Sequence, residues 1–264
     1  MTRLGEFVGI GRPKKKVTMA NNAVYKGTQT YFISRRGKLL RDFDNLTKRA
    51  RTALVSQYGF EFAGTVVTEA REEYSKLIPE IPYVGQHRIL VRFITGTAQS
   101  LAIYKVLRNH GKTVEEAGKL YYLTCKAILS SYPGIVRLLI GKVSFSKLFL
   151  RAVRRGALES QKRLYPGGYV FSFVEGDGRE FDYGVDYFEC GGCKFLSQQG
   201  ASELAPYICT ADIVYSDSFG WGLVRTKTIA EGFEKCDFRF KKGGKTGVAS
   251  HVMEEWEADP GVGS

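Results

Sequence analysis

Apolar residues in the first part of the chain recur with the spacing of amphipathic helices. One run of them lies at three- and four-residue intervals and comprises Leu39, Leu40, Phe43, Leu46, Ala50 and Leu54. Such spacing places them on one face of a helix. Two further helices are predicted from about Phe60 to Leu77, before Pro79, and from about Arg88 to Asn109, before Gly111. Proline and glycine at these places are typical helix ends.

The next helix start has a sharper signal. Thr113-Val-Glu-Glu116 fits a capping box, in which the threonine hydroxyl accepts the amide of Glu116 and the glutamate carboxylate reaches back. The helix that it opens carries Cys125. Another helix is predicted from about Ser146 to Leu164, ahead of Pro166-Gly167-Gly168.

After residue 168 the apolar period changes from that of a helix to that of a strand. Residues 169–175 and 180–188 alternate, and Gly176-Asp177-Gly178 between them predicts a hairpin turn. A short helix from Lys194 to Gln199 and two more strands, Trp221 to Ile229 and Cys236 to Phe240, complete the pattern. The predicted fold is α+β: a helical N-terminal half followed by a small, mostly antiparallel sheet that carries the cysteine motifs.

The 264 residues suffice for one domain with its own core. We predict a basic N-terminal arm over residues 1–30, a single domain over 31–245 and a flexible tail over 246–264. The net charge is +12, and residues 1–51 carry 13 Lys and Arg against 3 acids, 13 − 3 = +10. This arm could neutralise phosphates, but no aromatics interleave with its lysines as a platform for single-stranded nucleic acid requires. We therefore expect no nucleic-acid partner.

Composition narrows the class of protein that the sequence can encode. Apolar residues make up 44% of the chain. No apolar stretch approaches the roughly 18 residues of a membrane span, and the N-terminus has no signal-peptide pattern. We expect a cytoplasmic protein without a membrane partner, acting on a small molecule; a homo-oligomer is compatible with this size. Five cysteines, an odd number, favour thiols or a metal over a disulfide framework.

Four of the five cysteines fall close together, in the order Cys190-x2-Cys193-x15-Cys209-x26-Cys236. Two have an acid nearby, in Cys209-Thr-Ala-Asp212 and Cys236-Asp237. Thiols and carboxylates gathered so densely indicate a site. Each cysteine also has a purely structural interpretation, because a lone cysteine is commonly a small buried apolar residue. We favour that interpretation for Cys125.

A longer string of motifs carries a family resemblance. It consists of Cys190-Gly-Gly-Cys193, Gly200-Ala-Ser-Glu-Leu-Ala-Pro206, Cys209-Thr-Ala-Asp212, Arg225-Thr-Lys-Thr-Ile-Ala-Glu-Gly232 and Cys236-Asp-Phe-Arg239. In order and spacing this string resembles the L-2-amino-thiazoline-4-carboxylic acid hydrolase family, from about residue 181 to residue 240. Upstream only the Thr-Val-Glu-Glu-Ala helix start is similar. The resemblance implies a hydrolase that opens a small cyclic amidine to a carbamoyl-cysteine.

Ring opening needs attack on the amidine carbon and a proton for the leaving atom, and a thiolate can provide the attack. Cys209 is the first candidate, with Asp212 as acid/base or as the clamp on the amidinium. Cys236 is the second candidate, and Cys193 completes the catalytic set. Substrate-binding candidates are Arg225 and Arg239 for the carboxylate, with Thr226, Thr228 and Asp237. The histidines His87, His110 and His251 lie outside the motifs.

A non-enzymatic module is the alternative. Cys190, Cys193, Cys209 and Cys236 are near the spacing of structural zinc sites, and thiolates also hold iron–sulfur clusters. In this interpretation the protein has a structural or sensory role. Zinc or another metal is the only cofactor that the sequence raises.

Overall fold

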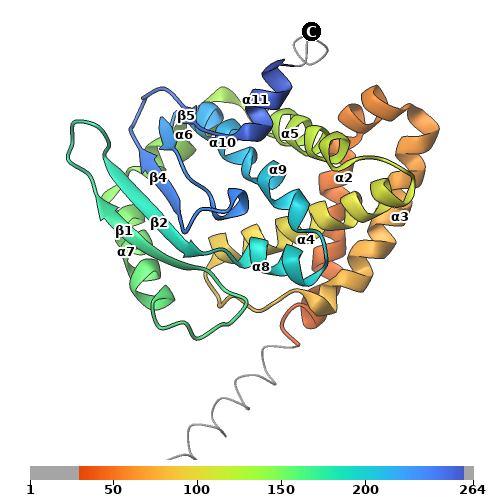
Figure 1. Ribbon diagram of the computed structural model, residues 1–264, viewed down its shortest axis with the longest axis horizontal. Helices are drawn as coiled ribbons and strands as arrows, with labels where there is room; N and C mark the ends of the chain where they lie inside the picture. Colours follow the sequence, from red (N-terminus) through yellow and green to blue (C-terminus); the bar gives the residue numbers. More distant parts are fainter. Residues whose placement is uncertain (1–29, 259–264) are drawn as a thin grey trace, which may run out of the picture.

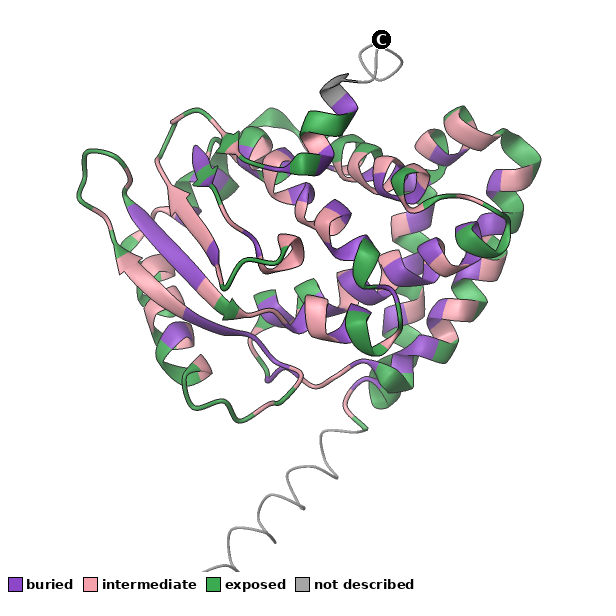
Figure 2. Cartoon of the chain, in the orientation of Figure 1, coloured by how far each residue is buried: buried purple, intermediate pink, exposed green. Residues whose placement is uncertain are grey.

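A computed structural model of the chain describes residues 30–258. The predicted basic arm therefore lies, except for its last residue, outside the described part. Figure 1 shows a layer of helices on one side, a sheet on the other, and shorter helices crossing between them. Buried residues line the region where these parts meet (Figure 2).

Four long helices pack against one another in the helical layer. They are α2 (Arg36–Tyr58), α3 (Phe60–Leu77), α4 (Arg88–Asn109) and α5 (Val114–Ser130), with short 3-10 turns η1 (Ile33–Arg35) before α2 and η2 (Ile78–Glu80) after α3. The predicted bounds of α3 and α4 are confirmed. The capping box is confirmed as well: Thr113 N donates to Glu116 Oε2 at 2.9 Å, and Glu116 N donates to Thr113 Oγ1 at 3.3 Å.

Two further helices follow where the sequence predicts one. They are α6 (Gly134–Ser144) and α7 (Lys147–Ser160). Phe149 N donates to Ser146 Oγ at 3.2 Å, which begins α7 with a side-chain cap. α7 ends at Ser160 rather than at Leu164, because Ser160 Oγ bonds to the backbone of Phe171. α7 is thus tied to the first strand.

The sheet has five strands in the order β1-β2-β4-β3-β5. They are β1 (Val170–Glu175), β2 (Tyr183–Glu189), β3 (Leu223–Arg225), β4 (Cys236–Phe240) and β5 (Gly247–Val248). The pairs β1/β2, β2/β4 and β3/β4 are antiparallel and β3/β5 is parallel. The α+β fold with a small, mostly antiparallel sheet is therefore confirmed.

The third predicted strand is too long. Only residues 223–225 form β3, and η4 (Ile229–Glu231) is a 3-10 turn. Between them Asp237 accepts the amides of Thr226 and Lys227 at 2.8 and 2.7 Å. These amides therefore do not form hydrogen bonds with a neighbouring strand, and the chain bends here.

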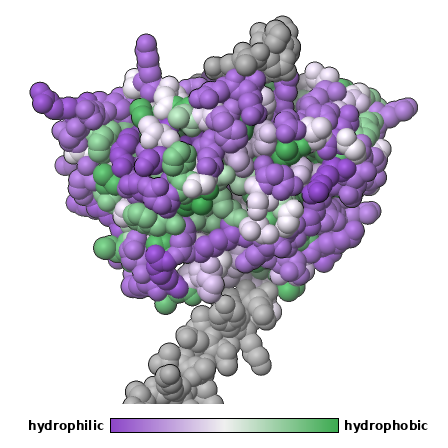
Figure 3. All heavy atoms as spheres, in the orientation of Figure 1, coloured by the Kyte–Doolittle hydropathy of each residue, from purple (hydrophilic) through white to green (hydrophobic). Residues whose placement is uncertain are grey.

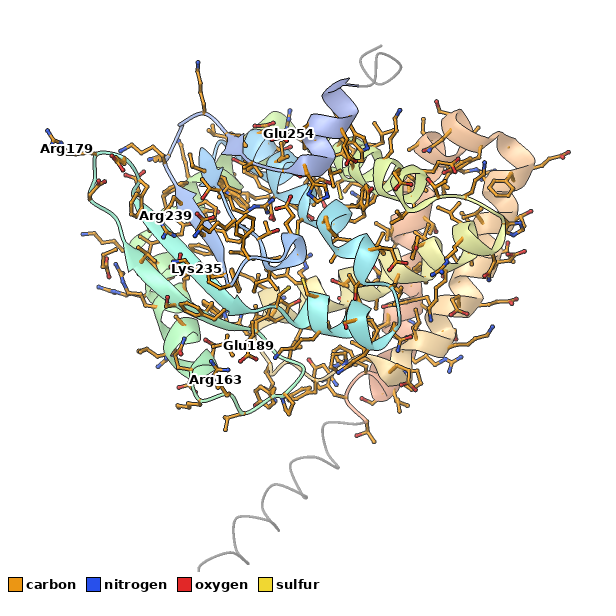
Figure 4. All side chains as sticks on the ribbon, viewed as in Figure 1. Arg163, Arg179, Glu189, Lys235, Arg239 and Glu254 are labelled. Atoms are coloured by element: carbon orange, nitrogen blue, oxygen red, sulfur yellow. The ribbon has the colours of Figure 1, made fainter. Side chains whose placement is uncertain are left out.

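The two faces of the sheet differ. In the pairing of β2 with β4, Tyr187 lies opposite Cys236 and Val185 opposite Phe238. Because side chains alternate along a strand, these residues share one face. This inner face packs on the helices, and α7 lies behind β1 and β2 in Figure 1. Asp186 and Arg239 lie on the outer face, where Figure 4 labels Arg239.

Shorter helices connect the two layers. They are α8 (Gly191–Gln198), η3 (Ser202–Leu204), α9 (Ala205–Cys209) and α10 (Ala211–Phe219). The sequence predicts a helix from Lys194 to Gln199, so α8 begins three residues earlier than predicted. α8 therefore starts inside the cysteine motif, and this start makes Cys190 its N-cap residue.

The last described segment has secondary structure. We expected residues 246–264 to form a flexible tail, but β5 and α11 (His251–Ala258) lie within them. Val252 is fully buried and Trp256 is 9% exposed, and both pack with Tyr207 of α9. Two buried apolar residues on one short helix explain why this segment docks on the domain.

Length and apolar content decide whether a helix meets the criteria for crossing a membrane. Within residues 30–258 no single helix is long and apolar enough for a span. α5 and α6 meet the criteria only as a pair, and they are bent by 102° relative to each other.

Candidate functional site

The end of β2 and the start of α8 form the first part of the site. Glu189 is the last residue of β2, and its carboxylate pairs with Arg163 and Lys194; Figure 4 labels Arg163 and Glu189 below α8. Lys194 also donates to Pro166 O at 2.9 Å. These contacts fix the turn in which Cys190 is the N-cap residue of α8.

Cys190 and Cys193 interact directly. A hydrogen bond from the Cys193 thiol, together with the backbone amides of Cys193 and Gly192, lowers the pKa of Cys190 against the opposing effect of burial. The same contact raises the pKa of Cys193, because that thiol keeps the shared proton. Amides at the start of a helix and an S–H donor are groups that stabilise a thiolate.

The glycines of this motif leave room for the sulfur. A Cβ added at Gly191 would lie 2.7 Å from Gly167 O and 2.9 Å from the ring of Tyr169. A Cβ added at Gly192 would lie 3.1 Å from Thr97 Oγ1 and 3.6 Å from Cys190 Sγ. Close packing on both sides therefore favours glycine at each position.

The junction of α9 and α10 forms the second part. Cys209 is the last residue of α9 and Asp212 lies in the first turn of α10. Asp212 forms an ion pair with Arg225 of β3, whose side chain is 1% exposed. Arg225 Nη1 also donates to Cys209 O at 3.3 Å, and its guanidinium lies 5.5 Å from the ring centre of Phe238. Its Nε is buried without a partner among the described residues.

Burial dominates the electrostatics at this junction. It raises the pKa of Cys209 well above its usual value; Arg225 opposes this effect, whereas the charge of Asp212 adds to it. Burial also raises the pKa of Asp212, against the effect of Arg225. The Asp212 side chain is nevertheless 32% exposed. The Asp212 carboxyl group is thus largely enclosed but touches solvent on one side. Such a group can exchange protons with solvent.

Cys236 reaches the same place from the inner face of β4. Its Sγ accepts the amide of Ile229 at 3.3 Å, and burial raises its pKa to about 12. The neighbouring Asp237 accepts Thr226 N and Thr226 Oγ1, and so belongs to the turn after β3. Cys236 and Asp237 therefore lie on opposite sides of the strand, as alternation requires.

The structure thus brings together six of the residues singled out by sequence. The pKa values of Cys190, Cys193, Cys209 and Cys236 each depend on other members of this group, and the charges of Asp212 and Arg225 act on both Cys209 and Cys236. We call these six residues the cysteine cluster.

Three of the other candidates have side-chain partners outside the cysteine cluster. Arg239 pairs with Asp186 on the outer face of the sheet. Thr226 serves the turn held by Asp237. Thr228 is fully buried, and its hydroxyl caps η4 by accepting Glu231 N at 3.1 Å.

Two neighbours of the cysteine cluster were not chosen from sequence. Tyr187 is on the inner face beside Cys236, and its pKa is raised by burial and by the charges of Cys190 and Asp212. Cys125 of α5 also feels the charge of Asp212, and burial raises its pKa to about 12. The alternation of residues 180–188 predicts that Tyr187 lies in a strand, but no local pattern connects α5 to this region.

The metal-binding alternative receives no support from the side-chain geometry. Within residues 30–258, no group of three or more His, Cys, Asp or Glu residues is arranged to hold a metal ion. The sulfurs of Cys190 and Cys193 are engaged with each other, and Cys236 Sγ accepts a backbone amide. Cys190, Cys193, Cys209 and Cys236 therefore do not form the four-thiolate site that this alternative requires.

The molecule also has apolar surface and a cavity near the start of α8. In Figure 3 apolar residues reach the surface in the middle of the face shown and are framed by polar ones. A cavity of 710 Å³ lies beside α7, and His87, Arg151, Arg155 and Tyr169 are among the residues that line it. Tyr169 also packs on Gly191. The cavity therefore adjoins the start of α8.

The fold, with cysteines converging from α8, α9 and β4 on a buried ion pair, defines a protein with a thiol-rich site. Comparison with known families gives this class a name. The sequence model of the L-2-amino-thiazoline-4-carboxylic acid hydrolase family matches residues 95–240, which is more than half of the chain. The chain belongs to this family. The match begins within α4, well upstream of the region recognised by motifs. No curated protein and no solved structure matches the chain.

Proposed function

We propose that this protein hydrolyses a small cyclic amidine of the 2-amino-thiazoline-4-carboxylate type and that the reaction takes place at the cysteine cluster. The observation that carries the proposal is the meeting of four cysteines with the Asp212–Arg225 ion pair inside the region matched by the family. A thiolate, a proton donor and a cation are the groups that opening such a ring requires.

Cys190 is the nucleophile in this proposal. It is the cysteine of the cluster whose surroundings lower the thiol pKa, whereas burial raises the pKa of Cys209 and Cys236. The choice of Cys209, made from sequence, remains a competing prediction. Both thiols lie in the cysteine cluster. The two assignments therefore differ in which sulfur attacks the substrate and not in the class of reaction.

The first step forms a bond between the Cys190 sulfur and the amidine carbon. The ring bond from that carbon to sulfur breaks, and Asp212 gives a proton to the departing sulfur. Asp212 suits this role because its raised pKa keeps it protonated at a higher pH than an ordinary aspartate.

Water then attacks the carbon held by Cys190. The thiolate leaves, and the product is a carbamoyl-cysteine with a free thiol. The net reaction consumes one water and releases no other molecule.

Arg225 has two parts to play in this proposal. Its Nη1 holds Asp212, and its unpaired Nε is a donor for which a substrate carboxylate is a suitable partner. Arg239 pairs with Asp186 on the outer face, so we assign the substrate carboxylate to Arg225 rather than to Arg239.

The test is release of product thiol from L-2-amino-thiazoline-4-carboxylate by the reduced protein, quantified by chromatography after the protein is filtered off. We expect turnover in the wild type, loss of more than about a hundredfold in Cys190→Ser, and a smaller loss in Cys209→Ser. Cys125→Ser is the matched control outside the family's cysteine string. Circular dichroism shows whether each variant is folded.

Each outcome has a distinct meaning. No release by the folded wild type would overturn the substrate. Full activity in Cys190→Ser with loss in Cys209→Ser would transfer the nucleophile to Cys209.

A further inference from the structure

Cys190 and Cys193 differ from the other cysteines in sharing one turn of helix. Cys190 is the N-cap of α8, and Lys194 N donates to Cys190 O at 3.0 Å, which closes the first turn. Residues three apart on a helix have Cβ atoms about 5–6 Å apart, and a disulfide needs about 3.5–4.5 Å between them. A shift of about 1–2 Å in the first turn therefore joins the two cysteines.

The two sulfurs are also chemically unequal. The sulfur of Cys190 receives the thiol of Cys193 and two backbone amides, whereas Cys193 acts as donor. Exchange between a dithiol and a disulfide needs this asymmetry: one thiolate attacks, and a second thiol nearby completes the exchange. Both residues are partly exposed.

The surroundings preserve the arrangement. Gly191 and Gly192 lie between the two cysteines, and their lack of side chains lets the backbone pass close to Gly167, Tyr169 and Thr97. The salt bridges of Glu189 with Arg163 and Lys194 fix both ends of the motif.

We propose that Cys190 and Cys193 form a redox-active dithiol that exchanges with low-molecular-weight disulfides. The Cys190 thiolate attacks one sulfur of the small disulfide, forms a mixed disulfide and releases one small thiolate. Cys193 loses its proton to solvent and attacks the Cys190 sulfur, and the second small thiolate leaves. The protein dithiol is thus oxidised by two electrons and the small disulfide is reduced to two thiols. This chemistry is independent of hydrolysis; that the disulfide would also stop turnover rests on the proposed function.

The experiment equilibrates the reduced full chain with mixtures of glutathione and glutathione disulfide, without oxygen. Acid quenching, alkylation and tryptic digestion follow. Cleavage after Arg179 and Lys194 yields one peptide, 180–194, that contains both cysteines. In oxidising mixtures we expect the wild-type peptide to lose two hydrogens and to take up no alkyl group. The other three cysteines should stay alkylated.

Two variants make the result decisive. Cys193→Ser should accumulate glutathione on Cys190, because the second thiol is missing. Cys209→Ser, the matched control, should form the 190–193 disulfide like the wild type. The proposal is overturned if the wild-type peptide stays alkylated at both cysteines in the most oxidising mixture. Lasting glutathione on wild-type Cys190, or a link from Cys193 to Cys209, would also overturn it.

The same samples separate this proposal from the hydrolase. A 190–193 disulfide in a protein without turnover supports the dithiol and counts against the proposed substrate. Turnover without the disulfide does the reverse.

Discussion

The start of α8 and the junction of α9 and α10 each bring a cysteine into the same cluster, but they treat it differently. At the start of α8, hydrogen-bond donors surround Cys190 and lower its pKa. At the junction, burial and the nearby Asp212 raise the pKa of Cys209, although Arg225 is close. The difference teaches that an acid near a cysteine in sequence does not activate it. Donors that point at the sulfur do.

Removal of the cation from the junction should have the largest effect. Arg225→Gln leaves the Asp212 carboxylate without its partner, and we expect a loss of about 3 kcal/mol in the free energy of unfolding. Urea denaturation measures it. Arg239→Gln is the control, since Asp186 keeps Lys235 as a partner. Equal losses of unfolding free energy in the two variants would show that Arg225 contributes no more to stability than Arg239.

The thiols themselves provide the second test. At pH 7 we expect iodoacetamide to modify Cys190 at least about thirtyfold faster than Cys209, because only the thiolate reacts. Peptide mass spectrometry over time gives both rates. The rate at Cys190 should also level off at a lower pH than the rate at Cys209, since its pKa is lowered and the other is raised. Faster reaction at Cys209 would reverse the comparison.

Two aspartates should give opposite pH dependences of stability. Burial raises the pKa of Asp212. Burial acts on Asp186 in the same direction, but Arg239 and Lys235 hold its pKa below the usual 3.8. A raised pKa means stability that is lost as pH rises through the folded-state value, and a lowered pKa means stability that is lost as pH falls through it.

We therefore compare each Asp→Asn variant with the wild type by urea denaturation over a range of pH. The stability advantage of the wild type over Asp212→Asn should shrink as pH rises above the ordinary aspartate range. Its advantage over Asp186→Asn should shrink as pH falls below that range. If both stability advantages changed in the same direction with pH, the raised pKa of Asp212 and the lowered pKa of Asp186 would be contradicted.

The smallest effect concerns the glycine next to the Cys190 sulfur. Gly192→Ala adds a Cβ that would lie 3.1 Å from Thr97 Oγ1. We expect a loss of about 1 kcal/mol and slower alkylation of Cys190. The double variant with Thr97→Ala should recover most of the stability. If it does not, the crowding lies elsewhere.

Local signals in the sequence predicted much of this fold. The ends of α3 and α4 depend on prolines and glycine close by, and the cap of α5 depends on Thr113 and Glu116 alone. The strand predicted up to Ile229 is wrong because Asp237, ten or more residues away, accepts the amides that a strand would have used. A pattern of apolar residues has no information about such a partner.

The same limit applies to the site. Sequence spacing singled out the residues of the cysteine cluster, but the expected helix began at Lys194 and α8 begins at Gly191. This difference of one turn conceals that Cys190 caps the helix and receives its amides. The pairing of Asp212 with Arg225 needs β3 beside α10, which is a contact made only by the folded chain.

The docking of α11 has a consequence for how the protein is handled on a surface or in a fusion. His251 Nδ1 lies 2.9 Å from Glu231 Oε1 of η4, and Trp256 packs on Tyr207 of α9, the helix that ends in Cys209. A bulky label attached just after Trp256 would disturb both contacts, His251 with Glu231 and Trp256 with Tyr207, beside the thiol-rich region. The loop between β1 and β2, where Figure 4 labels the protruding Arg179, is a better anchoring point for immobilisation.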